Sequence, residues 1–448
     1  MAVAEHTDIR KTILELLEYG ATSELREYLH DIHGADLAAV LESLPPSVRS
    51  LVWYEVSESD MGEMLTELSD QVAESLMSEM EPRTLVRVLQ MLDIDEIAEI
   101  MPQCPSKVAA QILVALDEER RKGLDTVLSY QEDTAGRLMN IDAPVVREGV
   151  KVAVIMRYLR VVGELPEYTD KIYVLDRQGR LRGAILLRNL VTASLDAQID
   201  DCIDEDLFRF SPDDSEEQVA QVFERYDLTS APVVDSDGRL LGRITIDDVV
   251  DLMKDTAGKN LLAPAGLDDE DDIFAPVLYT ARRRALWLGI NLITAVIASM
   301  VIGIFEATIE KLVALAVLMP IIPSMRGNAG TQTLTTVIRG LGVGTISTAN
   351  ALDVLKKELL VGGLNGLIWA TVVAVVSIVW YQNYLLATIV ATAMLVNIVV
   401  SALSGVLLPV MLEKVGIDPA LAGGVSLTTI TDVVGFLAIL GIAALVLV

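Results

Sequence analysis

Long apolar runs fill the last third of the chain. The segment Leu286–Ile304 has 19 residues without a charge, about enough to cross a hydrocarbon core of ~30 Å. Four more runs follow, at Leu312–Ile338, Leu359–Trp380, Tyr384–Leu412 and Leu421–Val448, and a polar stretch interrupts the first of these four. A single soluble core does not use five such runs, so the pattern predicts five transmembrane helices.

The first 136 residues show a different pattern. Apolar residues recur every three or four positions in short segments such as LAAVLESLPPSVRSLVWYEV (37–56), which is typical of helices with one buried face. Prolines mark the breaks, where they are tolerated in a first helical turn. We expect an all-α domain of stacked helical hairpins at 1–136, and we interpret its apolar stripe as core packing.

An internal repeat lies at 137–257. YVLDRQGRLRGAILLRNLV (173–191) aligns with PVVDSDGRLLGRITIDDVV (232–250) with eight identities in 19 positions. Each copy has the pattern of a strand, an Asp-x-x-Gly turn, a strand and a helix. The repeat resembles a tandem pair of α/β CBS domains, at about 137–200 and 201–257, which implies ligand sensing. The alternative is a duplicated structural unit that binds nothing.

Two residues of the second repeat match a motif that binds nucleotides in other CBS domains. CBS domains that bind adenosine nucleotides often place a Ser or Thr, and an Asp three residues later, against the ribose. The second repeat has Thr245 and Asp248 at these positions, whereas the first has Leu186 and Asn189. The resemblance makes Thr245 and Asp248 candidate ligands of a nucleotide such as ATP.

The charge is divided unevenly. Residues 282–448 hold 7 acidic and 9 basic residues, which leaves 57 and 26, a net charge of −31, for residues 1–281. Such a field repels nucleic acid and concentrates cations. Two cysteines cannot build a disulfide framework or a thiolate zinc site, and the three histidines all lie near the N-terminus. Histidine-based catalysis and softer metal ions in the membrane half are therefore disfavoured.

Positive charges set the expected orientation. The basic residues at the ends of the predicted spans lie on one side, except for Lys311. Because Lys and Arg are enriched in cytoplasmic loops, we expect a multi-pass protein of an inner or plasma membrane. Its N-terminus would be cytoplasmic and its C-terminus outside.

A polar motif, PIIPSMRGNAGTQT (320–333), interrupts the second apolar run. Its prolines, glycines and amides would disrupt a lipid-facing helix, whereas irregular or polar segments are tolerated where they line a cavity. This makes Asn328, Gly330 and Thr331 candidate pore-lining residues. Close helix packing through small residues is the alternative.

Asp432 is the only charge in the last apolar run. It lies about 16 Å beyond Leu421 at ~1.5 Å per residue, and carboxylates at such depth usually face a water-filled path or a partner. Thr428 and Thr429 share its helical face, so the helix carries a stripe of hard oxygen ligands. Such ligands suit Mg²⁺, which keeps several of its waters. A structural pair with Arg326 is the alternative.

Carboxylates also cluster in the cytoplasmic part. One group contains Asp95 and Glu99, and another contains Asp248 and Asp251, which share a helical face. Facing acidic surfaces repel unless cations lie between them, which offers a route to cation sensing. Solvated surface is the alternative interpretation.

These features together resemble the MgtE-type magnesium channels. The resemblance rests on GNAGTQT (327–333), GIDPAL (416–421), the deep T-D-x-x-G sequence, YQEDTAGRLM (130–139), the five spans and the CBS pair. It implies a non-enzymatic homodimer in lipid, with the pore between two membrane halves (282–448) and Asp432 of both subunits selecting hydrated Mg²⁺. It also implies that cytosolic Mg²⁺ joins the N-domain to the CBS pair and holds a connecting plug helix, at 258–281, that shuts the pore.

The resemblance assigns further residues by position. The implied Mg²⁺-sensing carboxylates are Glu63, Asp95, Glu99, Glu217, Asp227, Asp248 and Asp251, and Asp418 is implied to face the plug helix. The chain departs from the family at Lys259, where an acidic residue is expected. Transport of another divalent cation, such as Co²⁺ or Mn²⁺, and a membrane-anchored nucleotide sensor are the alternative functions.

Overall fold

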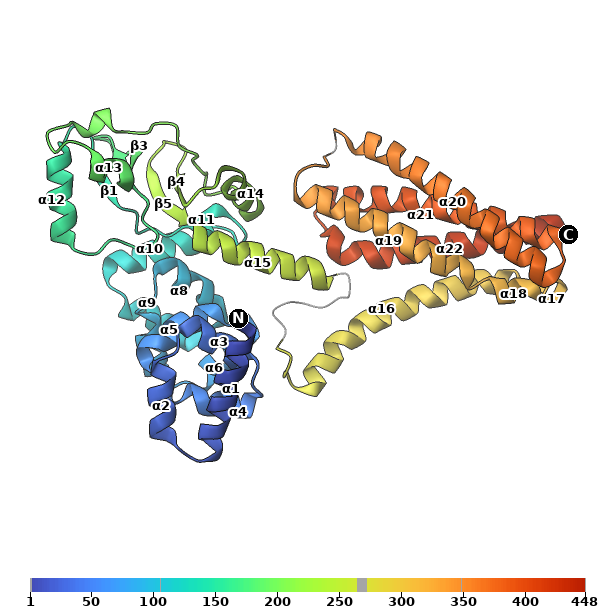
Figure 1. Cartoon of the computed structure of the whole chain (residues 1–448), viewed down its shortest axis with the longest axis horizontal. Coiled ribbons are helices and arrows are strands. Elements are labelled where there is room, and N and C mark those ends of the chain that lie inside the picture. Colours follow the sequence, from blue (N-terminus) through green and yellow to red (C-terminus); the bar gives the residue numbers. More distant parts are fainter. Residues whose placement is uncertain (1, 105, 264–271, 348, 448) are drawn as a thin grey trace. The chain divides into compact units, whose positions relative to one another are not determined.

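The computed structural model describes residues 2–104, 106–263, 272–347 and 349–447, with the backbone alone at 2–5, 106, 260–261, 326–328 and 447. The chain forms two compact units (Figure 1). One contains Met1–Ala257 with Asp269–Ala275, and the other contains Gly258–Asp268 with Pro276–Val448.

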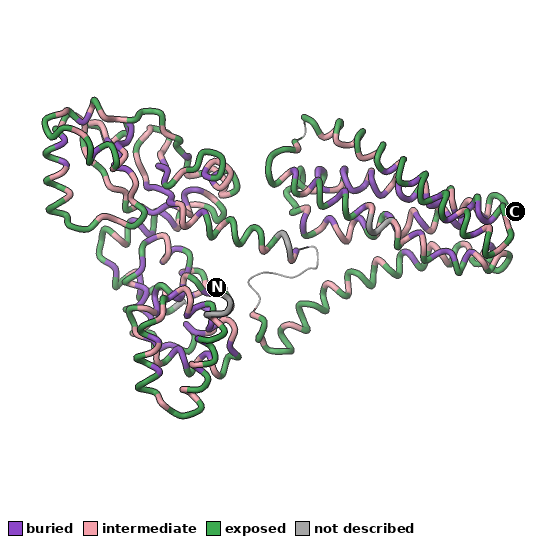
Figure 2. The backbone as a smooth tube through the Cα atoms, in the orientation of Figure 1, coloured by how far each residue is buried: buried purple, intermediate pink, exposed green. Residues whose placement is uncertain are grey.

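Short stacked helices build the N-terminal domain, as the sequence predicts. Each odd-numbered helix from α1 to α7 packs on the next odd-numbered one. Buried and exposed residues alternate along these helices (Figure 2), and the buried apolar residues form one core. Pro46 and Pro82 open α4 and α7, where a missing N–H costs nothing. The helices are α1 (Ala2–Glu18), α2 (Thr22–His30), α3 (Gly34–Glu42), α4 (Pro46–Trp53), α5 (Glu58–Glu67), α6 (Asp70–Glu79), α7 (Pro82–Leu89), α8 (Ile94–Ile100), α9 (Ser106–Ala115) and α10 (Glu118–Leu128).

The repeat folds as two copies of one α/β unit. In the first copy β1 (Val145–Arg147) pairs in parallel with β2 (Lys171–Leu175), which pairs antiparallel with β3 (Leu181–Leu186). In the second copy β4 (Ser230–Val234) pairs antiparallel with β5 (Leu240–Thr245). The remaining helices of the pair are α11 (Ala135–Leu138), α12 (Val152–Val162), α13 (Leu187–Thr192) and α14 (Glu216–Tyr226).

The predicted Asp-x-x-Gly turns are present in both copies. Asp176 Oδ1 accepts hydrogen bonds from two backbone N–H groups of its turn, and Asp235 Oδ1 does the same. Gly179 and Gly238 close the turns with φ of 81° and 79°, which favours glycine. The duplication inferred from sequence therefore extends to the geometry of the turns.

The N-domain shares its hydrophobic core with the second CBS copy. Phe210, Phe223 and Ile244 belong to the same buried cluster as the N-domain helices, whereas the first copy has a separate core. Asn140 connects the two sides of this junction, because its backbone exchanges two hydrogen bonds of 2.8 Å with Arg243 of β5 and its Nδ2 donates one of 3.2 Å to Asp93 Oδ2 of the N-domain. The acidic faces described below are held together by this shared core.

Gly242 permits the close approach at this junction, and its replacement by alanine is expected to destabilise the cytoplasmic unit. A Cβ at Gly242 would lie 2.5 Å from the backbone oxygen of Asn140, which cannot rotate away. Overpacking of this kind costs about 1–3 kcal/mol. Thermal unfolding should show a lower midpoint for Gly242→Ala, while Gly289→Ala, which has open space around it, should not lower the midpoint of this unit.

The last CBS helix continues beyond its domain. α15 (Ile246–Leu262) is one helix of 17 residues, and the first membrane helix, α16, begins at Val277. A single connecting helix at 258–281 is therefore wrong, because the helix before it simply extends to Leu262. Residues 264–271 of the expected plug lie outside the described residues.

Four described helices are long and apolar enough to cross a membrane. α21 (Tyr384–Lys414) is the central one, and it packs against three neighbours, α19, α20 and α22. Half of an apolar 18-residue stretch of α21 is buried inside the protomer, whereas only 6% of the corresponding stretch of α16 is buried. The helices of this unit are α16 (Val277–Ile304), α17 (Glu306–Lys311), α18 (Ala314–Leu318), α19 (Ile321–Gly342), α20 (Ala351–Tyr381), α21 and α22 (Pro419–Leu447).

The second apolar run differs from the prediction. Its polar motif is helical throughout α19, and the break comes earlier, at Met319 and Pro320 between α18 and α19. Pro323 lies in the first turn of α19, where a proline does not interrupt the helical hydrogen bonds. The expected disruption of the helix by the motif is therefore wrong, although the run is divided.

Candidate cation sites

α8 presents two carboxylates on one face. Its start is fixed by a capping box, in which the Glu96 carboxylate accepts a hydrogen bond of 2.7 Å from the backbone N–H of Asp93. Asp95 and Glu99 are four residues apart and therefore share a face. Asp95 Oδ1 is buried and has no hydrogen-bond partner among the described residues. A buried carboxylate oxygen without a donor requires a proton or a cation to offset its desolvation.

The first half of α15 carries a matching stripe. Asp248, Asp251 and Asp255 are spaced by three and four residues, which places them along one side of the helix. Thr245 Oγ1 fixes the first of them by donating a hydrogen bond of 2.9 Å to Asp248 Oδ2. We refer to the carboxylates of both helices as the acidic cluster, which consists of Asp95, Glu99, Asp248, Asp251 and Asp255.

The two halves of the acidic cluster repel each other. Burial, and then the charge of Asp248, raises the pKa of Asp95 well above its ordinary range. Burial raises the pKa of Asp248 to about 7, with Asp247 as the next cause. The pKa of Glu99 rises to about 7, from burial and then from Asp248, although this side chain keeps an exposed side where water screens the charge. At neutral pH the arrangement therefore needs protons or cations.

Carboxylates of α5 and α6 form the edge of the acidic cluster. Burial, and then Asp251, raises the pKa of Glu67, and Glu63 adds to this effect. Asp70 contributes to the raised pKa of Glu99. Glu63 therefore lies beside the cluster through Glu67, at its periphery.

The carboxylates fit a hydrated cation better than a tightly bound one. Among the described residues, no three His, Cys, Asp or Glu side chains are placed to hold one metal ion. Mg²⁺ retains several waters and is commonly held by one or two carboxylates. The partnerless buried oxygens of Asp95 and Asp247 are suitable acceptors for such waters.

The raised pKa values predict how the stability of the cytoplasmic unit depends on pH. Without Mg²⁺, the folded unit holds more protons than the unfolded chain between the ordinary pKa of Asp248, 3.8, and its folded value of about 7. Stability should therefore fall as the pH rises through this window, by up to a few kcal/mol at about 1.36 kcal/mol per pKa unit. Thermal unfolding across this range should show the slope in EDTA and a flatter profile with Mg²⁺. A slope that is the same in both conditions would contradict cation binding at the cluster.

The membrane unit carries its acidic residue deep in α22. Asp432 lies ~20 Å along the helix from Pro419 at ~1.5 Å per residue. Thr428, one turn before it, is exposed in the single chain, and Asp432 and Thr429 are partly exposed. Gly435, one turn beyond, lies against the carboxamide of Asn397 on α21. The polar stripe of α22 therefore has an open side at the surface of the protomer.

The motif of α19 packs through its small residues. A Cβ at Gly330 would lie 3.1 Å from Leu427 of α22, and a Cβ at Gly405 would lie 2.9 Å from that of Thr333. Thr331 is exposed. The packing alternative thus holds for Gly330, while Thr331 remains a candidate pore residue. The side chains of Asn328 and Arg326 lie outside the described residues.

Asp418 has a structural partner. Its Oδ1 accepts a hydrogen bond of 2.7 Å from the backbone N–H of Ala420, so it caps the N-terminus of α22, with Pro419 at the first position. The side chain is exposed. Its second carboxylate oxygen remains a candidate for the role that the resemblance implies.

Known protein families match three parts of the chain. Residues 319–442 match MgtE, a divalent cation transporter, residues 32–133 match the MgtE intracellular N domain, and residues 199–255 match a CBS domain. The chain is 31% identical to the magnesium transporter MgtE of Thermus thermophilus over 443 residues, which covers 97% of this chain and 98% of the relative. This chain belongs to the MgtE family.

Other MgtE proteins are similar over comparable lengths. The magnesium transporter MgtE of Bacillus subtilis is 27% identical, and the alignment covers 96% of each chain. A crystal structure of the cytosolic domain of the Mg²⁺ channel MgtE in complex with ATP has a TM-score of 0.51 and 32% identity, and covers 54% of this chain and 99% of that one. MgtE membership confirms that the membrane unit is a transporter rather than an enzyme or a plain anchor.

Two carboxylates assigned by the MgtE resemblance lie away from the interactions described above. Glu217 is in the first turn of α14, and Asp227 is its C-cap, with φ of 50°. Among the described residues, neither is a cause of the raised pKa values of Asp95, Glu99 and Asp248 in the acidic cluster. Their assignment remains a prediction from position alone.

Sequence reasoning missed three acidic neighbours of the predicted residues. Glu67 and Asp255 each lie four residues after an assigned carboxylate, so helical periodicity could have found them. Asp70 begins another helix, α6, and its place beside the cluster depends on tertiary packing that no local pattern reveals.

The candidate nucleotide residues are already engaged with each other. Thr245 Oγ1 donates a hydrogen bond of 2.9 Å to Asp248 Oδ2, so the two side chains lie together. Asp248 is therefore a candidate both for a nucleotide and for the acidic cluster.

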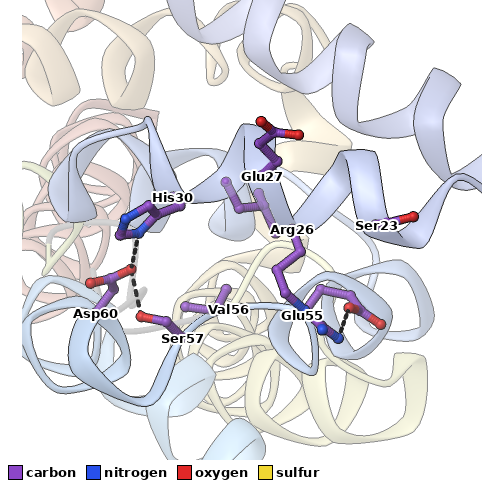
Figure 3. A pocket seen from close by; sticks show the side chains of 9 residues that line it. Ser23, Arg26, Glu27, His30, Glu55, Val56, Ser57 and Asp60 are labelled. Atoms are coloured by element: carbon purple, nitrogen blue, oxygen red, sulfur yellow. Dashed lines mark hydrogen bonds and ion pairs between the residues drawn. The ribbon is translucent and has the colours of Figure 1, made fainter.

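A pocket lies elsewhere on the N-domain, between α2 and the start of α5 (Figure 3). Its charged side chains pair across it: Arg26 Nη2 lies 2.7 Å from Glu55, and His30 Nδ1 lies 3.8 Å from Asp60. Because Glu55 there already pairs with a guanidinium and Asp60 lies beside an imidazole, we do not assign a cation to this pocket.

Proposed function

We propose that this protein is a Mg²⁺ channel for passive uptake, closed by cytosolic Mg²⁺ that binds at the acidic cluster. The single observation that supports it best is the deep carboxylate of Asp432 on α22, within the part that matches the divalent cation transporter family. The relatives named above are magnesium transporters. The membrane potential, worth ~2.3 kcal/mol per charge per 100 mV, supplies the driving force.

Selection of the ion rests on hard oxygen ligands. Asp432, Thr428 and Thr429 offer a carboxylate and hydroxyls, which suit a hydrated Mg²⁺. None of the His or Cys residues that softer ions favour occurs between residues 282 and 448 of the sequence. Transport of Co²⁺ or Mn²⁺ remains the alternative for the same pathway.

Closing rests on charge neutralisation in the cytoplasm. The acidic cluster joins α8 of the N-domain to α15, and α15 continues beyond the CBS pair toward the membrane unit along the chain. When cytosolic Mg²⁺ rises, cations between the helices remove the repulsion and stabilise this contact. When it falls, the contact weakens and the channel opens.

A homodimer completes the pore in this proposal. The polar stripe of α22 is open at the protomer surface, and α16 buries little of its apolar length. A second copy and lipid would cover these surfaces. In each copy the N-terminus is cytoplasmic and the C-terminus is outside, and ATP is a further candidate ligand of the CBS pair.

Uptake into proteoliposomes loaded with a fluorescent Mg²⁺ indicator tests passive transport. Without ATP or a proton gradient, Mg²⁺ should enter down its gradient, and a negative interior potential should accelerate entry. Entry that requires ATP or a proton gradient would contradict the channel. Parallel assays with Mn²⁺ and Co²⁺ would identify the alternative cation if either enters faster.

A further inference from the structure

A buried ion pair joins the N-domain to the segment that leads into the membrane unit. Arg49 of α4 is only 1% exposed, and the Asp272 side chain 7%. Arg49 Nη1 donates a hydrogen bond of 2.8 Å to Asp272 Oδ2, and Nη2 donates one of 3.2 Å to Oδ1. The pair is therefore a bidentate contact between residues 223 positions apart.

The N-domain holds this arginine in place. Arg49 Nε donates to the backbone oxygen of Leu41 at 3.0 Å, and Nη2 to that of Leu44 at 3.1 Å. These carbonyls lie in the last turn of α3 and just beyond it, where helical carbonyls lack partners in the helix. The guanidinium is thus anchored on one side, and its other side is directed at a carboxylate.

Asp272 makes two further hydrogen bonds besides those with Arg49. Its backbone N–H donates to Gln71 Oε1 of α6 at 2.6 Å, and its Oδ1 accepts from the backbone N–H of Phe274 at 2.8 Å. Burial alone would raise the pKa of Asp272, but the hydrogen bonds from Arg49 and Phe274 outweigh it and lower the pKa. The carboxylate is therefore charged at neutral pH, and both partners of the pair are satisfied.

The position of Asp272 along the chain gives this contact its significance. It lies five positions before Val277, the first residue of α16, and each residue spans at most ~3.3–3.6 Å. Whatever holds Asp272 therefore restrains the start of the first membrane helix within ~17 Å. The contact between Arg49 and Asp272 occurs in the same unit and arrangement in which the α8 carboxylates of the acidic cluster face those of α15.

We propose that Arg49 is a docking site for Asp272 in the segment before α16, which ties the cation-sensing N-domain directly to the first membrane helix. This inference rests on the proposed closing by cytosolic Mg²⁺. The N-domain then acts on the membrane unit through two connections, α15 and the docked segment. Because docking accompanies the arrangement that the cation stabilises, it adds to the closed state.

Three variants separate this role from a purely structural one. Asp272→Asn removes the charge that Arg49 binds. A flexible Gly-Ser insertion between Ala275 and Pro276 leaves the pair intact and lengthens the tether. Arg26→Met removes an exposed arginine, also paired with a carboxylate in the N-domain, and serves as the matched control. Mg²⁺ uptake by each full-length variant is measured over a range of cytosolic Mg²⁺ concentrations.

Asp272→Asn and the insertion should each raise the cytosolic Mg²⁺ needed for half closure by about tenfold, within the usual range of allosteric coupling. Uptake without cytosolic Mg²⁺ should stay at the wild-type level, and Arg26→Met should close like the wild type. Wild-type closure in either variant would overturn the proposal. A shift in Asp272→Asn but not in the insertion would also overturn it, because the pair would then act within the N-domain alone. If the wild type itself does not close, the proposed function fails instead.

Discussion

Replacing Asp432 by alanine is expected to abolish Mg²⁺ uptake. The carboxylate is the acidic group that we assign to the cation within the membrane, and a hydrogen bond to a charged group contributes about 1.5–3 kcal/mol. Its loss from both subunits of the proposed dimer should slow uptake by at least ~100-fold, at about 1.4 kcal/mol per factor of ten. Proteoliposome uptake without internal Mg²⁺ measures the effect in the open state.

Controls make this result specific. Asp432→Asn keeps the shape and removes the charge, so it should also be inactive if charge is the requirement. Asp353→Ala removes an exposed carboxylate in the first turn of α20 that pairs with Lys356, and it should transport like the wild type. Uptake that survives in a correctly assembled Asp432→Ala protein would place selection elsewhere, with the Asn328 region as the next candidate.

The double variant Asp95→Asn/Asp248→Asn is expected to stay closed without cytosolic Mg²⁺. Both carboxyl groups have raised pKa values, caused first by burial, so their charged forms oppose the contact between α8 and α15 at neutral pH. Amides of the same size remove that opposition, which for Asp248 alone corresponds to a few kcal/mol at about 1.36 kcal/mol per pKa unit. Uptake at zero internal Mg²⁺ should fall at least tenfold, and added Mg²⁺ should change it little.

Two exposed acidic residues of α10 provide the matched control. Glu119→Gln/Asp125→Asn removes the same charge from a surface outside the acidic cluster, and Mg²⁺ should close this variant as it closes the wild type. A double variant at Asp95 and Asp248 that stays open at every Mg²⁺ concentration would contradict the role of repulsion, because the carboxylates would then serve only as ligands. Unchanged closure would contradict any role of the cluster.

The elements that the sequence predicted well are those with a local cause. Apolar runs long enough for a bilayer became α16, α20, α21 and α22, and the repeated Asp-x-x-Gly turns became matching turns in the CBS pair. The motif at 320–333 was misjudged because its two prolines precede or begin α19 instead of interrupting it. The single connecting helix expected at 258–281 was wrong because α15 runs past Gly258 to Leu262 and α16 begins at Val277.

The sites depend on contacts that no local pattern contains. Asp95 and Asp248 could be grouped only through the family resemblance, since 153 residues separate them in the sequence. Arg49 looks like one surface residue of an amphipathic helix, and its ion pair with Asp272 appears only in the folded unit. Burial of a charged side chain is a tertiary property, and it was the signal that identified both contacts.

Recording from excised membrane patches tests the central claim most directly. The cytosolic face of a patch containing the wild-type protein is exposed to a bath in which Mg²⁺ can be changed, with Mg²⁺ as the permeant cation on the other side. We predict a Mg²⁺ current that is present in a Mg²⁺-free bath and declines reversibly as Mg²⁺ is added there. A current that ignores bath Mg²⁺, or no Mg²⁺ current in the Mg²⁺-free bath, would contradict a channel closed by cytosolic Mg²⁺.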